Sequence, residues 1–306
     1  MPPPLRGRSG RFLRRAAIGA AAAAAALLGG CSSELMNPQG PVGADEKTIL
    51  LDALGIMLVI VVPTIAATLL FAWWFRASNT QARYRPTFAY SGRVEVVTWS
   101  IPILVILFLG GLTWVGSHKL DPAEPLKSAT PAVNVEVVSL DWKWLFIYPD
   151  QGVASVNELV VPAGTPVHLK LTSASVMNTF FVPQLGGMIY TMNGMADDLY
   201  LQADHPGVYA GRSAHFSGDG FSDMHFDVHA VPPAEFAAWV GQTRGAGPSL
   251  DETAYTALAK QSSNLAPFTY RNVSADLFDH IVQQRLAPGP GPAPDAPAPT
   301  TPKQGS

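Results

Sequence analysis

The chain of 306 residues has a single cysteine, Cys31, and few charged side chains. One cysteine excludes an intrachain disulfide and any metal site that needs several thiolate ligands. Lys, Arg, Asp and Glu make up only 14% of the sequence, and residues 117–284 contain 8 Lys and Arg against 17 Asp and Glu. This acidic region therefore lacks the basic face that nucleic-acid binding requires.

The N-terminal segment has the pattern of an export signal. Arg11, Arg14 and Arg15 precede an apolar run at 16–28, which is too short for a membrane span and ends in Leu-Gly-Gly before Cys31. This pattern predicts that residues 1–30 are a removed lipoprotein signal peptide and that Cys31 carries a diacylglyceryl group. The alternative is an ordinary signal peptide with an incidental cysteine. The lipoprotein interpretation is favoured, and it implies a bacterial envelope protein.

Two long apolar segments, 49–75 and 94–116, are predicted to be transmembrane helices. Residues 53–75 carry no charge, and at about 1.5 Å per residue they would extend roughly 35 Å, enough to cross a bilayer. The loop 76–93 has four arginines and no acid, so the positive-inside rule places it in the cytoplasm. The segment 31–48 and everything after 116 are then outside, which predicts a multi-pass lipoprotein of the bacterial inner (cytoplasmic) membrane.

Residues 132–231 are predicted to form an exported β-domain. VNVEVVSLDWKWLFIY and VHLKLT alternate apolar and polar residues, and turn signals recur about every dozen residues, which is typical of a small antiparallel sandwich. The alternation also predicts that Trp142 and Trp144 share a strand face. Residues 233–285 carry helical signals. The proline-rich tail 286–306 has almost nothing to bury and is expected to be disordered.

The polar loop GRSAHFSGDGFSDM, residues 211–224, and the strand after it are the candidate site. His225, Asp227 and His229 would share one strand face and are a possible metal-binding set, although a solvated polar face opposite buried Met224, Phe226 and Val228 is favoured. Ser213, His215 and Asp219 are close in sequence, but nothing indicates the ordered geometry of nucleophilic catalysis. His168 and His205 are interpreted as surface or turn residues.

Several phrases together resemble subunit II of haem-copper oxidases: DWKWLFIYPDQG, VNELVVPAGTPV, SVMNTFFVPQLG and PGVYAGRSAHFSGDGFSDM. The resemblance covers nearly all of residues 31–285 and is strongest for the cytochrome bo-type ubiquinol oxidase branch. It implies an α+β membrane protein with a transmembrane helix hairpin. An exported cupredoxin-like antiparallel β-sandwich, short C-terminal helices and a disordered tail would complete it.

The resemblance also implies what the polar loop corresponds to in other members of the family. The cytochrome c oxidase branch carries a binuclear copper centre in this domain, and only Met224 retains a ligand type here. The other ligand positions fall on Asn178 and Phe221 (both His in that branch), Ser213 and Ser217 (both Cys), and His215 (Glu, through its carbonyl). Hydroxyls do not replace thiolates towards copper. The resemblance thus implies an emptied copper site, no metal in this chain, and quinol rather than cytochrome c as electron donor.

Two further roles follow from the resemblance. Glu95 matches an acid at the mouth of a proton-uptake channel, and its alternative is a carboxylate exposed to headgroups. Copper-containing members use an aromatic near Trp142 and Trp144 for electron transfer. Without copper, these tryptophans are expected to pack against the membrane face or the large subunit.

The sequence thus predicts subunit 2 of a proton-pumping ubiquinol oxidase, a structural and proton-uptake subunit without its own redox centre. Haems, copper and the active site would reside in the large partner subunit, with smaller membrane subunits, the bilayer and ubiquinol as further partners. The alternatives are a free-standing lipoprotein binding module and a cytochrome c oxidase subunit, which five of six copper positions disfavour.

Overall fold

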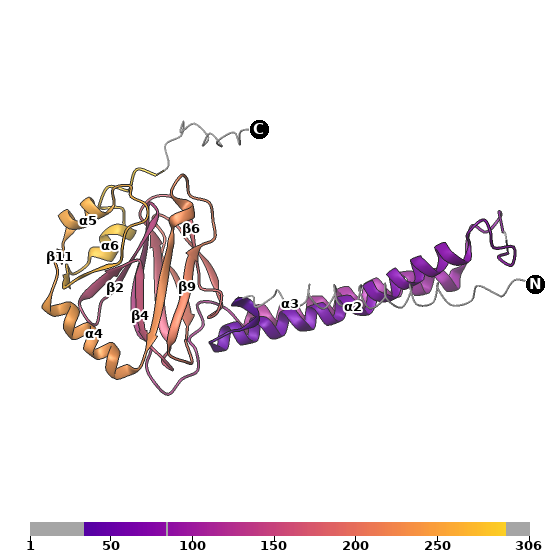
Figure 1. The fold of residues 1–306 in the computed structure, drawn as a ribbon, viewed down its shortest axis with the longest axis horizontal. Coiled ribbons are helices and arrows are strands. Elements are labelled where there is room, and N and C mark those ends of the chain that lie inside the picture. The colour runs from indigo at the N-terminus through magenta and orange to yellow at the C-terminus, as the bar shows by residue number, and fades with distance from the viewer. Residues whose placement is uncertain (1–33, 84, 292–306) are drawn as a thin grey trace, which may run out of the picture. The chain divides into compact units, whose positions relative to one another are not determined.

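The computed structural model describes residues 34–83 and 85–291. The predicted signal peptide, Cys31 and residues 292–306 of the predicted tail lie outside this range. The chain divides into two units, Met1–Asn37 and Pro38–Ser306. In the described part of the first unit there is one short 3-10 helix, η1 (Glu34–Met36). The second unit contains two long helices and a β-sandwich (Figure 1).

The two long helices are α2 (Pro41–Trp74) and α3 (Gly92–Lys119). Both are long and apolar enough to cross a membrane, and no residue of their most apolar windows is buried inside the chain. Figure 1 shows them side by side. They approach closely near the end that leads into the sandwich, where a Cβ on Gly116 would lie 2.9 Å from Ile49 Cδ1. These uncovered apolar faces require lipid or another subunit as a neighbour.

The sandwich consists of two sheets. The first has the strand order β12-β3-β2-β1-β5-β8 and the second β4-β10-β9-β6-β7. The strands of the first are β1 (Val133–Leu140), β2 (Lys143–Tyr148), β3 (Val153–Val156), β5 (Val167–Ser173), β8 (Asp197–Leu201) and β12 (Phe268–Tyr270). Those of the second are β4 (Glu158–Pro162), β6 (Asn178–Phe181), β7 (Met188–Thr191), β9 (Gly207–Ser213) and β10 (His225–Val231).

The sequence pattern predicted an antiparallel sandwich, but two of its strand pairs are parallel. β1 pairs with β5 in parallel, and β10 pairs with β4 in parallel. Alternation of apolar and polar residues reports which face of a strand is buried and does not report the direction of its neighbour. The β-sandwich itself is confirmed, with two parallel pairs as a correction.

The expectation that Trp142 and Trp144 share a strand face is wrong. Asp141 and Trp142 form the tight turn between β1 and β2, and Trp142 has a left-handed φ of 65°. Trp144 lies on β2 and is fully buried, with its ring 5.6 Å from that of Phe180 and 5.5 Å from that of Phe226. A side chain in the core cannot contact another subunit, so the predicted packing role fails for Trp144.

The C-terminal region forms a third layer on the first sheet. It contains α4 (Pro233–Gly245), α5 (Glu252–Leu258), α6 (Leu277–Val282) and the small parallel pair β11 (Ser249–Leu250) and β13 (Asn272–Val273). Figure 1 shows these helices on the side of β2 away from β9. All six residues of β2 are buried, because one core cluster lies between the sheets and a second lies beneath the C-terminal segments.

The first residues of the predicted tail continue this layer. The Gly289 N–H donates to the Ala174 oxygen at 2.8 Å, and the Gly291 N–H donates to Asp141 Oδ2 at 2.9 Å. The expected disorder from residue 286 therefore does not describe residues 286–291.

Two hydrogen bonds donated by main-chain N–H groups join the beginning of α2 to the sandwich. Gly43 N–H donates to the Leu185 oxygen at 3.1 Å, and Gly187 N–H donates to Glu46 Oε1 at 3.0 Å. Gly186 is at φ 92°, and a Cβ there would lie 2.6 Å from Gly43 N. Only glycine fits this close approach with a left-handed backbone.

Candidate functional site

The loop between β9 and β10 folds over the beginning of β6. The Ser213 N–H donates to the Met224 oxygen at 3.0 Å, and the Ala214 N–H donates to the Thr179 oxygen at 3.2 Å. Within the loop, Phe221–Asp223 forms the 3-10 helix η2. These bonds bring the beginning of β6 and both ends of the loop to one place at the edge of the sandwich.

Four of the six predicted copper-ligand positions form a buried cluster there: Asn178, Ser213, Ser217 and Met224. Ser213 Oγ donates to Asn178 Oδ1 at 3.3 Å and also lies 3.3 Å from the His215 main-chain oxygen. Ser217 Oγ donates weakly to Met224 Sδ at 3.9 Å. The cluster thus offers an amide, two hydroxyls, a carbonyl and a thioether, a donor set without thiolate or imidazole.

Of the other two positions, His215 contributes only its main-chain oxygen to the cluster, and the Phe221 side chain has no donor atom. The His215 ring lies edge-on to Tyr190, with ring centroids 6.0 Å apart, and Phe221 lies edge-on to Phe216 at 5.6 Å. Copper sites in cupredoxin-type domains are built from thiolate and imidazole ligands, and neither occurs among the side chains of this cluster. The residues present do not fit a copper centre.

Trp142 covers this loop, a role that the sequence did not predict. Its indole Nε1 donates to the Ser217 oxygen at 3.0 Å. A Cβ on Gly220 would overlap the Trp142 ring, so the ring rests directly on the glycine backbone. The only sequence signal was the position of Trp142 between two strand-like runs, where a tight turn places it at the sandwich edge.

In the part of the chain that the structure describes, the polar side chains of the strand after the loop are not brought together as a metal-ligand set. His225 and Asp227 are exposed, and His229 Nε2 lies 3.5 Å from Glu158 Oε1. Met224, Phe226 and Val228 are buried, as predicted. Within residues 34–83 and 85–291 no group of three or more His, Cys, Asp or Glu is placed to hold a metal ion. The polar side of β10 is a solvated face.

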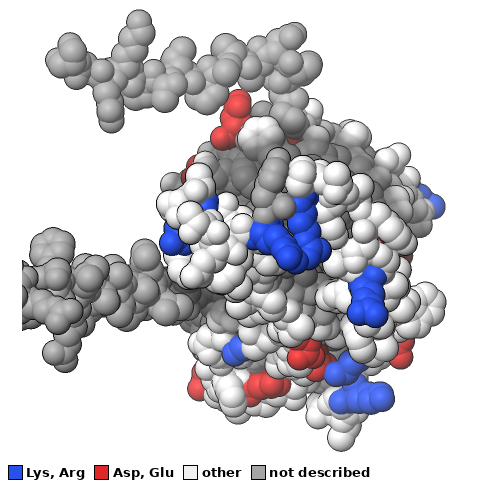
Figure 2. Space-filling view, turned by 90° about the vertical axis from the view of Figure 1, so that its right-hand side faces the viewer, with Lys and Arg blue, Asp and Glu red and all other residues white. Residues whose placement is uncertain are grey.

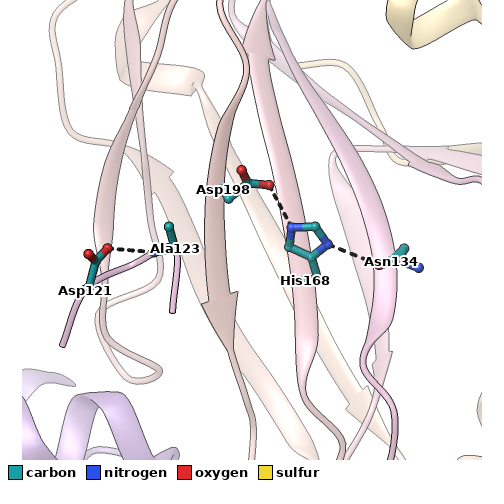
Figure 3. A network of polar contacts seen from close by, with 5 residues as sticks. All are labelled: Asp121, Ala123, Asn134, His168 and Asp198. Atoms are coloured by element: carbon teal, nitrogen blue, oxygen red, sulfur yellow. Dashed lines mark hydrogen bonds and ion pairs between the residues drawn. The ribbon is translucent and has the colours of Figure 1, made fainter. Parts of the chain in front are cut away.

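His168 takes part in a polar network across the first sheet. Its Nε2 lies 2.7 Å from Asp198 Oδ1 and its Nδ1 lies 3.1 Å from Asn134 Oδ1, as Figure 3 shows. Tyr200 stacks on the imidazole at 4.5 Å. Three neighbouring strands are joined in this way. The network is structural and lies apart from the loop.

Two ionisable residues outside the loop, the buried Lys143 and the half-buried Glu136, were not predicted. Lys143 is fully buried and its Nζ donates to the Lys260 oxygen and to Ser262 Oγ, both at 2.7 Å. Burial lowers its pKa to about 8, which nearby Asp141 partly opposes. Glu136 lines a cavity of about 230 Å³ between the first sheet and α6. Burial, then repulsion from Asp279, raises the pKa of Glu136 to about 7, and Lys170 opposes the shift.

Glu95 lies in the first turn of α3, and no other part of the chain covers its side chain. Its N–H donates to the Ser91 oxygen at 3.0 Å. A carboxylate in the first turn of a helix interacts favourably with the helix dipole. Glu95 therefore sits at the end of the hairpin opposite to the sandwich, next to the loop 76–93.

The comparisons with known proteins agree with this architecture. Residues 150–231 match the family model described as cytochrome c oxidase subunit II, periplasmic domain, and residues 244–289 match the COX aromatic rich motif. The fold and these matches define the class: a subunit II of the haem-copper oxidases, with two apolar helices before a β-sandwich.

The chain is 50% identical over 256 residues to cytochrome bo(3) ubiquinol oxidase subunit 2 of Pseudomonas aeruginosa, covering 84% of this chain and 77% of that one. It is 46% identical over 274 residues to ubiquinol oxidase subunit 2 of Acetobacter aceti, covering 89% of each. A solved periplasmic domain of subunit II of cytochrome oxidase from Bradyrhizobium japonicum is 25% identical, with a TM-score of 0.35, over 38% of this chain and 96% of that one. The chain belongs to the ubiquinol oxidase subunit 2 family.

Proposed function

We propose that this chain is a subunit 2 without a redox centre in a proton-translocating ubiquinol oxidase. Ubiquinol supplies the electrons, and the haems, the copper and the oxygen chemistry reside in the large subunit. This chain anchors the assembly, covers the outer side of the large subunit and contributes Glu95 to proton uptake. Smaller membrane subunits complete the complex.

The loop over β6 carries this proposal. Ser213, Ser217 and Asn178 occupy the positions where the copper-binding branch has two thiolates and an imidazole. Ser213 Oγ is within hydrogen-bond distance of Asn178 Oδ1 and of the His215 carbonyl, and Ser217 Oγ donates weakly to Met224 Sδ. A donor set of hydroxyls and amide does not compete for copper, so electrons have no metal through which to pass from cytochrome c. A membrane quinol, which delivers electrons directly to the large subunit, does not need this route.

Exposed apolar side chains beside the loop support a docking role. Phe216 is 71% exposed, Met188 56% and Tyr190 47%. Apolar side chains gathered at one edge of an exported domain are typical of a protein interface. On the face drawn in Figure 2, basic and acidic side chains are interspersed among uncharged ones, without the continuous basic patch of a nucleic-acid site.

The proposal includes an orientation of the chain in the membrane. α2 and α3 cross the bacterial inner (cytoplasmic) membrane, residues 76–93 are cytoplasmic, and the sandwich and a lipid-modified Cys31 are outside. Glu95 then lies at the cytoplasmic end of α3, where protons are taken up. Ionisable residues at such positions are often functional.

The test is oxygen uptake by the purified complex with either ubiquinol or ferrous cytochrome c as donor. Uptake with ubiquinol alone is the expected result. Uptake driven by cytochrome c would overturn the assignment, because it would require an electron route that this loop cannot provide. A chain that purifies alone, without haem proteins, would instead indicate a free-standing binding module.

A further inference from the structure

A groove of about 810 Å³ runs between the two long helices. Nine of its ten lining residues are apolar or glycine: Leu51, Gly55, Ile56, Val59, Leu107, Phe108, Gly111, Leu112 and Val115. The tenth is Asp52. Gly55 and Gly111 have nothing within 4 Å of where a Cβ would be, so the absent side chains leave the groove open.

The groove is polar only at the end near the sandwich. A smaller hollow there shares Leu112 and Val115 with the groove and reaches Asp45, Thr48 and Lys119. Lys119 Nζ lies 2.8 Å from Asp45 Oδ2, and these side chains are 60% and 38% exposed. The ion pair thus remains accessible to a further charged group.

Asp52 stands between this polar end and the apolar part. Among the residues that the structure describes, no hydrogen bond or ion pair joins the Asp52 carboxylate to another side chain. A carboxylate on a membrane helix without a partner is costly, and such residues generally pair with an opposite charge. The groove therefore presents a carboxylate without a partner between its polar end and its apolar part.

We propose that this groove binds a membrane phospholipid whose headgroup carries both an ammonium and a phosphate. One acyl chain lies along the apolar wall, the ammonium pairs with Asp52, and the phosphate lies beside Lys119. The proposal requires the helices to cross the membrane, and to that extent it rests on the proposed function. It goes beyond that function because it assigns a lipid site to this chain.

The balance of charges selects the headgroup. The polar end contains two carboxylates, Asp45 and Asp52, and one ammonium, Lys119. A headgroup that carries only negative charge would meet two like charges, whereas a zwitterion finds a partner for each of its groups. The gradient from charged to apolar lining also matches an amphiphile rather than a uniformly apolar helix of another subunit.

Two neighbouring glycines provide a matched pair of variants. Gly111 lines the groove, and Gly110 does not. A Cβ at either position meets nothing within 4 Å. Gly111→Phe should therefore obstruct the groove, whereas Gly110→Phe adds the same ring to the same helix outside it. The purified complex of each variant would be exposed to a phosphatidylethanolamine with a photoactivatable group on its acyl chain, and labelled peptides would be mapped by mass spectrometry.

Labelling of α2 and α3 in the unaltered complex, a several-fold loss with Gly111→Phe and no loss with Gly110→Phe are the expected results. With Asp52→Asn, an equally photoactivatable phosphatidylglycerol should gain several-fold relative to phosphatidylethanolamine. Equal labelling of both glycine variants would overturn the proposal, as would labelling confined to the large subunit.

The acyl chain has a second possible source in the chain itself, namely the lipid predicted on Cys31. A Cys31→Ser complex that loses bound acyl chains from the groove, while added phosphatidylethanolamine fails to label it, would overturn the assignment to a membrane phospholipid. Labelling that persists in this variant supports it. Oxygen uptake with ubiquinol, measured on the same preparations, shows separately whether the proposed function holds.

Discussion

The indole Nε1 of Trp142 donates a hydrogen bond of 3.0 Å to the main-chain oxygen of Ser217. This bond joins the β1–β2 turn to the loop between β9 and β10, two segments 75 residues apart in the chain. The ring also rests on Gly220. The loop is therefore held in shape by an aromatic cap.

Gly220→Ala is expected to destabilise the protein through this cap. Gly220 has φ −92°, which alanine adopts readily, so the effect is steric. The added methyl overlaps the Trp142 ring, and overpacking of this kind costs about 1–3 kcal/mol. Thermal unfolding of the full chain in detergent measures it. The control is Gly241→Ala in α4, where a Cβ meets nothing within 4 Å and the change should be neutral or slightly stabilising. Equal effects of the two changes would contradict the cap.

Lys143→Met is expected to loosen the C-terminal layer. The change removes the charged donor to the Lys260 oxygen and to Ser262 Oγ and leaves these part-buried acceptors without it, at a cost of about 1–3 kcal/mol. Limited proteolysis should then cut near residues 259–262 more rapidly. Lys260→Met is the matched control, because its side chain is exposed and its main-chain oxygen remains. If the Lys143→Met chain resists proteolysis as well as the control does, Lys143 does not hold the C-terminal layer in place.

Glu136 should make the stability of the exported domain depend on pH. Its folded-state pKa of about 7 lies above the ordinary value of 4.5. The folded state therefore binds the proton more tightly than the unfolded state. The contribution of Glu136 to the free energy of unfolding is therefore fully present below about pH 4.5 and is lost as the pH rises through about 7.

Glu136→Gln removes the charge and should raise the free energy of unfolding at pH 8 by about 1–2 kcal/mol, a value reduced for partial solvent screening. At pH 4 the variant should differ little from the unaltered chain. Thermal unfolding at the two pH values measures this, with the exposed Asp227→Asn as control. A Glu136→Gln chain with the same pH dependence as the parent would rule out this origin.

Copper binding is expected when thiolate and imidazole ligands are introduced at the predicted ligand positions. A combined variant with Asn178→His, Ser213→Cys, Ser217→Cys and Phe221→His supplies two thiolates and two imidazoles around Met224. Thiolate ligands favour copper strongly. The purified chain should then bind copper and show thiolate-to-copper absorption in the visible range. The two histidine changes alone, with both serines kept, should not. Copper uptake without this absorption would mean that the four positions do not converge on one site.

Glu95→Gln tests the proposed proton-uptake role. Loss of a proton-transfer group is expected to slow ubiquinol-driven oxygen uptake by about tenfold or more, while ubiquinol affinity and haem content stay unchanged. Glu95→Asp should restore part of the rate and shift its pH profile. Glu124→Gln, an exposed carboxylate after α3, is the control. Unchanged turnover and proton pumping in Glu95→Gln would remove this residue from the pathway.

The sequence by itself determined the elements whose signals are local. The uncharged run at 53–75 required a long apolar helix, period-two alternation predicted the strands, and the residue types at 213 and 217 excluded thiolate ligands wherever the loop lay. These conclusions depend on neighbouring residues and on side-chain chemistry alone. They hold before any long-range contact forms.

Only the tertiary structure decided which segments meet. The parallel pairing of β1 with β5, the burial of β2 on both faces and the position of Trp142 over Ser217 all join segments far apart in the sequence. The burial of Lys143 likewise depends on the C-terminal layer, which supplies the Lys260 oxygen. Local periodicity reports the face on which a side chain lies but not its neighbour, so these relationships become visible only when the chain is folded.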